Sequence, residues 1–167
     1  VPAKVGKTLL ATQALVHIGL GMDLWGYHTV PKRVLYTDFE MGLYTVSDRL
    51  RLLNQSYPEA QDILRVQVRP KSLEAAIDLI GEHWGQWPEV WVIDPLIRLG
   101  YADENNNAEV RRRLDTLEQY AQTMGSPALI IVHNAGKPMR VPDAKQYEGL
   151  DIGRGATSIK DWLDTQV

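Results

Sequence analysis

The first residues of this sequence that could do chemistry are Gly6, Lys7 and Thr8, which precede an apolar run with helical spacing. They fit the end of the pattern G-x-x-x-x-G-K-[ST], in which backbone amides cradle phosphates, the lysine neutralises the terminal phosphates and the hydroxyl holds magnesium. The candidate phosphate-binding segment is therefore Pro2, Ala3, Lys4, Val5, Gly6, Lys7, Thr8 and Leu9. The alternative is that these residues are only the polar start of an ordinary helix.

Val1 stands where the first glycine of that pattern belongs. A β-branched residue tolerates positive φ poorly, so either the loop differs there or the chain is clipped ahead of it. A phosphate-binding loop normally follows a strand, and no strand pattern precedes this one. The sequence therefore favours clipping.

A second candidate group is Asp94, which ends the apolar run in EVWVIDPL (89–96). A carboxylate at such a strand end can hold a magnesium-bound water near the loop threonine, which makes Thr8 and Asp94 the candidate metal-holding residues. Taken alone, an aspartate in this position more often forms a turn or caps a helix. A third apolar run, ALIIVH, ends at His133. A phosphate loop, an acidic strand end and a polar strand end, in that order, are what a nucleotide-hydrolysing enzyme of this architecture needs.

The elements that must position these groups alternate along the chain. Apolar spacing predicts helices over 7–20, 44–53, 73–80 and 108–124, and strands over 33–38, 63–68, 89–96 and 128–133. This alternation predicts an α/β fold with a mostly parallel sheet and right-handed crossovers. The polar segments 100–107 and 136–155 interrupt the pattern and are expected to be loops, the second of them functional.

Composition limits the classes of protein that this chain can be. Its 167 residues are 44% hydrophobic and 23% charged, which predicts one domain over 1–167 with a core of its own. The net charge of -3 means that any contact with nucleic acid must come from local loops. There is no cysteine, and the four histidines lack the spacing of a zinc site. No apolar run is long enough to cross a membrane and no signal peptide is present, so we expect a cytoplasmic protein.

Five stretches carry a resemblance to a known family: VGKTLLATQAL, RVLYTDFEM, VIDPLIRLGYADENN, ALIIVHNAGKP and GRGATSIKDWLD. Together they resemble the RecA-like AAA family of P-loop ATPases, which includes the RepA-type hexameric replicative helicases of mobilisable plasmids. The resemblance runs in order over nearly the whole chain. It departs at Val1, which stands in place of the first glycine, and at Asn134, where a second histidine is common in the family. It implies a RecA-like P-loop core, a mostly parallel sheet flanked by helices, lacking its first and last strands in this chain.

The resemblance implies roles for individual residues. By position, Glu40 activates the attacking water, with Asp38 in support; a general base must come within about 3 Å of that water. The alternative left open is that Asp38 and Glu40 cap a helix that begins near Gly42. His133 would sense the terminal phosphate. Arg154 resembles the arginine finger that such helicases extend into the next subunit's nucleotide, with Arg98 a weaker candidate for the interface.

The resemblance also implies ATP and Mg²⁺ as cofactors and a ring-shaped homo-hexamer as the assembly. Six copies of the loop from Lys137 to Gly153 could line a channel and contact single-stranded DNA. That loop carries phosphate-binding charges and an aromatic ring: Lys137, Arg140, Lys145 and Tyr147.

The expected function is an ATP-hydrolysing motor on single-stranded DNA, a replicative helicase of a plasmid, phage or mobile element. Two alternatives stay open: a recombination, repair or signalling ATPase of the same fold that does not unwind duplexes, and a nucleotide-binding regulatory module without turnover.

Overall fold

A parallel sheet forms the centre of the computed structural model, which describes residues 6–83, 85–96, 107–133 and 162. Within these residues the sheet has the order β2-β1-β3-β4, and every neighbouring pair of strands is parallel. The strands are β1 (Val34–Asp38), β2 (Leu64–Val68), β3 (Val90–Asp94) and β4 (Ala128–Ile131). The predicted α/β fold with a mostly parallel sheet is confirmed.

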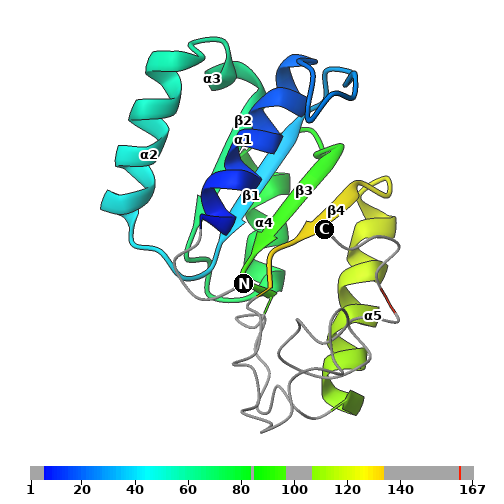
Figure 1. Ribbon diagram of the computed structural model, residues 1–167. Coiled ribbons are helices and arrows are strands. Elements are labelled where there is room, and N and C mark those ends of the chain that lie inside the picture. The colour runs from blue at the N-terminus through cyan, green and yellow to red at the C-terminus, as the bar shows by residue number, and fades with distance from the viewer. Residues whose placement is uncertain (1–5, 84, 97–106, 134–161, 163–167) are drawn as a thin grey trace, which may run out of the picture.

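Helices cover both faces of this sheet (Figure 1). They are α1 (Lys7–Leu20), α2 (Leu43–Ser56), α3 (Ala60–Ile63), α4 (Leu73–His83) and α5 (Asn107–Thr123). Because successive strand residues point to opposite faces, β1 contributes to two separate cores. Leu35 packs with residues of α4 and α5, while Val34 and Tyr36 pack with residues of α1 and α3.

The parallel register brings the carboxyl ends of the strands to one edge of the sheet. Asp38, the last residue of β1, lies opposite Asp94, the last residue of β3. Ile131, the last residue of β4, ends one step earlier, opposite Ile93. The side chains that follow these strands therefore start from neighbouring positions.

The predicted helices and strands are all present, with shifts of a few residues at their ends. The strand expected over 89–96 is shorter, and the strand expected from residue 63 begins at Leu64 because Ile63 belongs to the short helix α3. The sequence did not predict α3, since four residues are too few to show a helical period. On α2, the only fully buried side chain is Val46, so this helix packs loosely against the rest.

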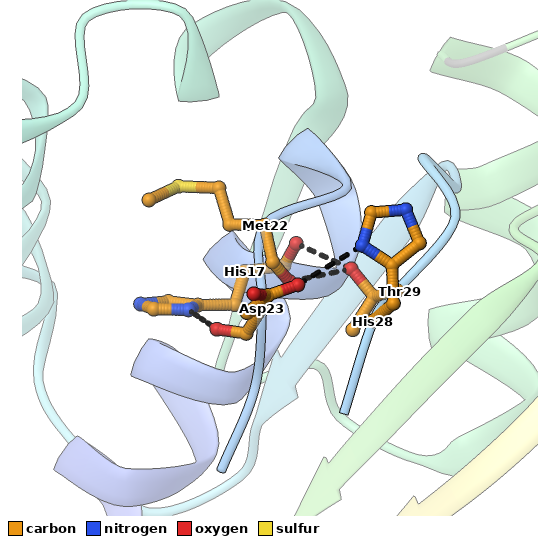
Figure 2. A network of polar contacts seen from close by, with 5 residues as sticks. All are labelled: His17, Met22, Asp23, His28 and Thr29. Atoms are coloured by element: carbon orange, nitrogen blue, oxygen red, sulfur yellow. Dashed lines mark hydrogen bonds and ion pairs between the residues drawn. The ribbon is translucent and has the colours of Figure 1, made fainter. Parts of the chain in front are cut away.

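A polar network fixes the carboxyl end of α1 (Figure 2). It lies at the opposite end of the sheet from the carboxyl end of β3 (Figure 1). The Thr29 hydroxyl lies 2.7 Å from the Met22 carbonyl oxygen and 3.1 Å from that of His17. His17 Nδ1 lies 2.6 Å from the Asp23 carbonyl oxygen, and His28 Nδ1 lies 2.9 Å from Asp23 Oδ1. These contacts hold residues 22–29 against the end of α1.

Gly21 ends α1 in the left-handed conformation, with φ 69°. Its neighbour Met22 donates its backbone N–H to the His17 carbonyl oxygen at 2.8 Å. A Cβ on Gly21 would lie 2.6 Å from Pro31 Cδ, so both the backbone angle and the available space require glycine here.

No helix in the described part of the chain is long and apolar enough to span a membrane.

Replacing Gly21 with alanine is expected to lower the free energy of unfolding by about 1–2 kcal/mol, because a Cβ is strained at positive φ, and the contact with Pro31 adds to this. The matched control is Gly81→Ala within α4, where a Cβ meets only Trp87 Cη2 at 4.0 Å. That change is expected to raise stability by about 0.5–1 kcal/mol. Urea denaturation of both variants measures the two effects, and equal signs would contradict the assignment of Gly21.

Candidate functional site

The beginning of α1 is joined to the carboxyl end of β3 by one carboxylate oxygen. The Thr8 hydroxyl donates a hydrogen bond to Asp94 Oδ2 at 2.8 Å, across 86 positions of sequence. The Tyr36 hydroxyl donates to the same oxygen at 2.6 Å. Asp94 is 7% exposed and Tyr36 4%, so these two side chains are buried, while Thr8 is half-buried. Since its donors come from α1 and β1, Asp94 does more than cap a local turn.

Gly6 precedes this group and adopts the left-handed conformation, with φ 84° and ψ 14°. Its carbonyl oxygen accepts the first backbone bond of α1, from Leu10 N at 2.8 Å. The N–H groups of Lys7, Thr8 and Leu9 are left without intrahelical partners by helix geometry, and no acidic residue occupies this first turn. Such a helix start attracts anions through its free N–H groups and its dipole, which is the requirement for binding phosphate.

Asp38 organises the turn that carries Glu40. Its Oδ1 atom accepts hydrogen bonds from the backbone N–H groups of Glu40 at 2.8 Å and Met41 at 2.7 Å. The N-cap of α2 is Gly42, and no described side chain caps that helix. The helix-cap alternative for Asp38 and Glu40 is therefore not what the structure contains; instead Asp38 holds the backbone of the preceding turn, and Glu40 itself is exposed.

Burial governs the ionisation of two groups in this region. Burial is the main cause that raises the pKa of Asp38, outweighing the lowering by its two backbone donors, Met41 and Glu40. Asp38 is 1% exposed, and its Oδ2 atom has no hydrogen-bond partner among the described residues. Burial, followed by the neighbouring Asp94 carboxylate, raises the pKa of Tyr36 far above its ordinary value. Tyr36 therefore stays a neutral hydrogen-bond donor.

A small cavity lies between α1, α2 and the sheet, beside Thr8. Thr8, Tyr36 and Arg49 all contribute to its lining. The Arg49 guanidinium, on α2, also lowers the pKa of Asp38 against the effect of burial. Tyr36 and Arg49 are the site residues that the sequence interpretation missed. The available signal for Tyr36 was its position two residues before Asp38, which places both side chains on one face of β1.

The predicted site residues that the structure describes lie at the same edge of the sheet. Lys7 is the first residue of α1 and is half-buried. His133 lies two residues after the end of β4, and the carbonyl oxygen of its neighbour Val132 accepts a hydrogen bond from Leu96 N at 2.9 Å. Glu40, Asp94 and His133 thus follow or end three adjacent strands, β1, β3 and β4. The remaining predicted residues lie outside the described ranges: Pro2, Ala3, Lys4, Val5, Arg98, Lys137, Arg140, Lys145, Tyr147 and Arg154.

The chemistry of the donors at Thr8 and Asp94 fits magnesium. A hydroxyl and a carboxylate, 2.8 Å apart, supply oxygen ligands only. Magnesium prefers oxygen, and it usually keeps several waters and takes one or two carboxylates plus substrate phosphates. Within the described ranges no group of three or more His, Cys, Asp or Glu side chains could hold a metal ion.

The fold and this site define a P-loop nucleotide-binding protein of the α/β class. A family model described as an AAA domain matches residues 2–139, and the chain belongs to this family of P-loop ATPases. A search of the curated proteins finds no match to the chain.

Replacing Asp38 with asparagine removes the buried charge and keeps an acceptor oxygen for the N–H groups of Glu40 and Met41. Because burial raises the pKa of Asp38 in the folded state, the parent loses stability as pH rises from the unfolded pKa through the folded one. We expect the stability of Asp38→Asn, relative to the parent, to increase between about pH 4 and pH 7. Urea denaturation across this range measures the difference.

The matched control is Asp78→Asn on the exposed side of α4, for which no such trend is expected. A stability difference for Asp38→Asn that is flat, or that decreases with pH, would show that the folded state does not disfavour the Asp38 carboxylate.

Proposed function

We propose that this protein is an ATP-hydrolysing motor that acts on single-stranded DNA, of the type of a ring-shaped replicative helicase. The observation that carries the ATPase part is the hydrogen bond from Thr8 to Asp94, which joins the phosphate-binding helix start to the acidic end of β3. The extension to DNA rests on the resemblance of the five sequence stretches to hexameric replicative helicases. ATP and Mg²⁺ are the proposed cofactors.

In this proposal the start of α1 binds the phosphates. The backbone N–H groups of residues 7–9 and the Lys7 ammonium meet the negative charge of the terminal phosphates. Thr8 and Asp94 are the residues that would hold the metal. Magnesium, when bound, neutralises charge on the phosphate oxygens during transfer.

Hydrolysis then requires a base for the attacking water. Water oxygen bonds to the terminal phosphorus, the bond to the bridging oxygen breaks, ADP leaves, and the water proton passes to the Glu40 carboxylate. Asp38 supports this step because it fixes the backbone of Glu40 through its Oδ1 atom. His133, beside the end of β3, is proposed to sense the terminal phosphate, and Arg154 to reach the nucleotide of the neighbouring subunit.

The proposed DNA contact is the loop from Lys137 to Gly153, repeated around a ring. A net charge of -3 gives a single chain little general attraction to DNA. Repetition by symmetry would gather the loop's lysine and arginine charges in one channel, with Tyr147 available for stacking on bases. The same ATPase site also suits a motor that does not unwind duplexes, so unwinding needs its own assay.

Glu40→Gln is expected to bind ATP within a factor of about two of the parent and to lower kcat by about 100-fold or more, because general-base catalysis is lost while the charge-binding groups remain. Lys7→Ala is expected to abolish nucleotide binding. Equilibrium binding of a fluorescent ATP analogue and a phosphate-release assay measure the two effects.

The matched controls are Glu118→Gln, on the exposed side of α5, and Lys71→Ala, ahead of α4. Both should keep parental binding and turnover. Parental turnover in Glu40→Gln or Lys7→Ala would remove the corresponding assignment.

Single-stranded DNA is expected to stimulate ATP hydrolysis by the assembled protein, and the stimulation should weaken as salt is raised, because the contact depends on phosphate charge. Phosphate release with and without a single-stranded oligonucleotide, run beside a native mass measurement, tests the motor and the ring together. Strand displacement from a forked duplex separates a helicase from a motor without unwinding. A rate that DNA leaves unchanged at low salt would favour the alternatives.

A further inference from the structure

The Tyr36 hydroxyl is a donor that the P-loop motif does not require. In that motif the loop Ser or Thr hydroxyl holds the magnesium, and the sequence pattern specifies no tyrosine. Here Tyr36 approaches Asp94 Oδ2 more closely, at 2.6 Å, than Thr8 does, at 2.8 Å. Two hydroxyls from different elements thus share one carboxylate oxygen.

The two donors differ in how firmly the fold holds them. Tyr36 lies in the middle of β1, opposite Val92, and its ring belongs to the buried core that includes Leu15 and Val16. Thr8 lies in the first turn of α1 and is only half-buried. The Thr8 hydroxyl can ligate a cation through an oxygen lone pair while its O–H still donates to Asp94, so the position of Thr8 depends on the cation. The Tyr36 O–H is held by the packing of its buried ring, so its bond to Asp94 Oδ2 is set by the fold.

We propose that Tyr36 is a positioning residue of the magnesium site, whose hydroxyl fixes the orientation of the Asp94 carboxylate. The inference rests on the proposed nucleotide-binding function and adds to it. Groups that orient a metal-holding side chain commonly change metal affinity by 10- to 100-fold when they are removed, an order-of-magnitude range. Tyr36 acts through Asp94, so its loss should change the dependence on magnesium and leave the phosphate-binding groups of α1 intact.

The test is Tyr36→Phe, which keeps the buried ring and removes only the hydroxyl. Binding of a fluorescent ADP analogue is measured first in EDTA and then across a titration with Mg²⁺. We expect the half-saturating Mg²⁺ concentration to rise about tenfold in Tyr36→Phe. Binding in EDTA should stay within a factor of about two of the parent, since the N–H groups and Lys7 are unchanged.

Two controls separate positioning from general disturbance. Tyr57→Phe, at the C-cap of α2, also removes one phenol hydroxyl and should keep the parental Mg²⁺ dependence. In an Asp94→Asn background, the further change Tyr36→Phe should not raise the half-saturating Mg²⁺ concentration any more. The reason is that the carboxylate that Tyr36 orients has already been replaced. Thermal melting of each variant reports whether the fold is kept.

An unchanged Mg²⁺ half-saturation in Tyr36→Phe would overturn the inference, as would an equal loss of binding with and without Mg²⁺, which indicates a purely structural role. An additive loss in the Asp94→Asn background would overturn it as well. These failures differ from failure of the proposed function, in which the parent itself would bind no nucleotide in either condition.

Discussion

The hydrogen bond between Thr8 and Asp94 is the constraint on which the candidate site depends. It joins the first turn of α1 to the last residue of β3, elements that lie 86 positions apart in sequence. Two conditions make it possible. The buried face of α1, with Leu15 and Val16, must pack on the sheet, and the parallel register must bring Asp94 to the edge where α1 begins. The geometry of the site therefore depends on the packing of the core in this protein.

The alternation of side chains along β1 lets a single strand serve both the core and the site. Tyr36 and Asp38 face the site, while Thr37 faces the other layer, where it accepts a hydrogen bond from Trp91 Nε1 at 2.8 Å and donates one to Gln67 Oε1 at 2.9 Å. This buried polar chain crosses three strands. Because a register shift of one residue would leave these groups unpaired and move Asp38 off the site, the chain helps to specify the register.

The carboxyl edge of the sheet contains carboxylates whose burial costs free energy. Asp38 and Asp94 are both nearly inaccessible to solvent. The charge of Asp94 raises the pKa of Asp38, and the charges of both carboxylates raise the pKa of Tyr36. Hydrogen bonds from Thr8, Tyr36 and the backbone of Glu40 and Met41 offset part of this cost. Groups with shifted pKa values gathered in one place are typical of functional sites, and here Asp38 and Tyr36 have raised pKa values beside the proposed magnesium site.

By itself, the sequence determined the parallel α/β fold and the helices of 7–20 and 108–124, because local apolar periodicity encodes them. It singled out Thr8 through the P-loop pattern and Asp94 through its place at the end of an apolar run. It left two alternatives open at Asp38 and missed α3, since four residues carry no period. At Asp38 the structure shows a local turn, in which its Oδ1 atom holds the backbone of Glu40. Only the tertiary structure decided that Tyr36 binds Asp94, 58 positions away. The physical reason is that a hydrogen bond depends on distance in space, which strand order and register set, and no local pattern records it.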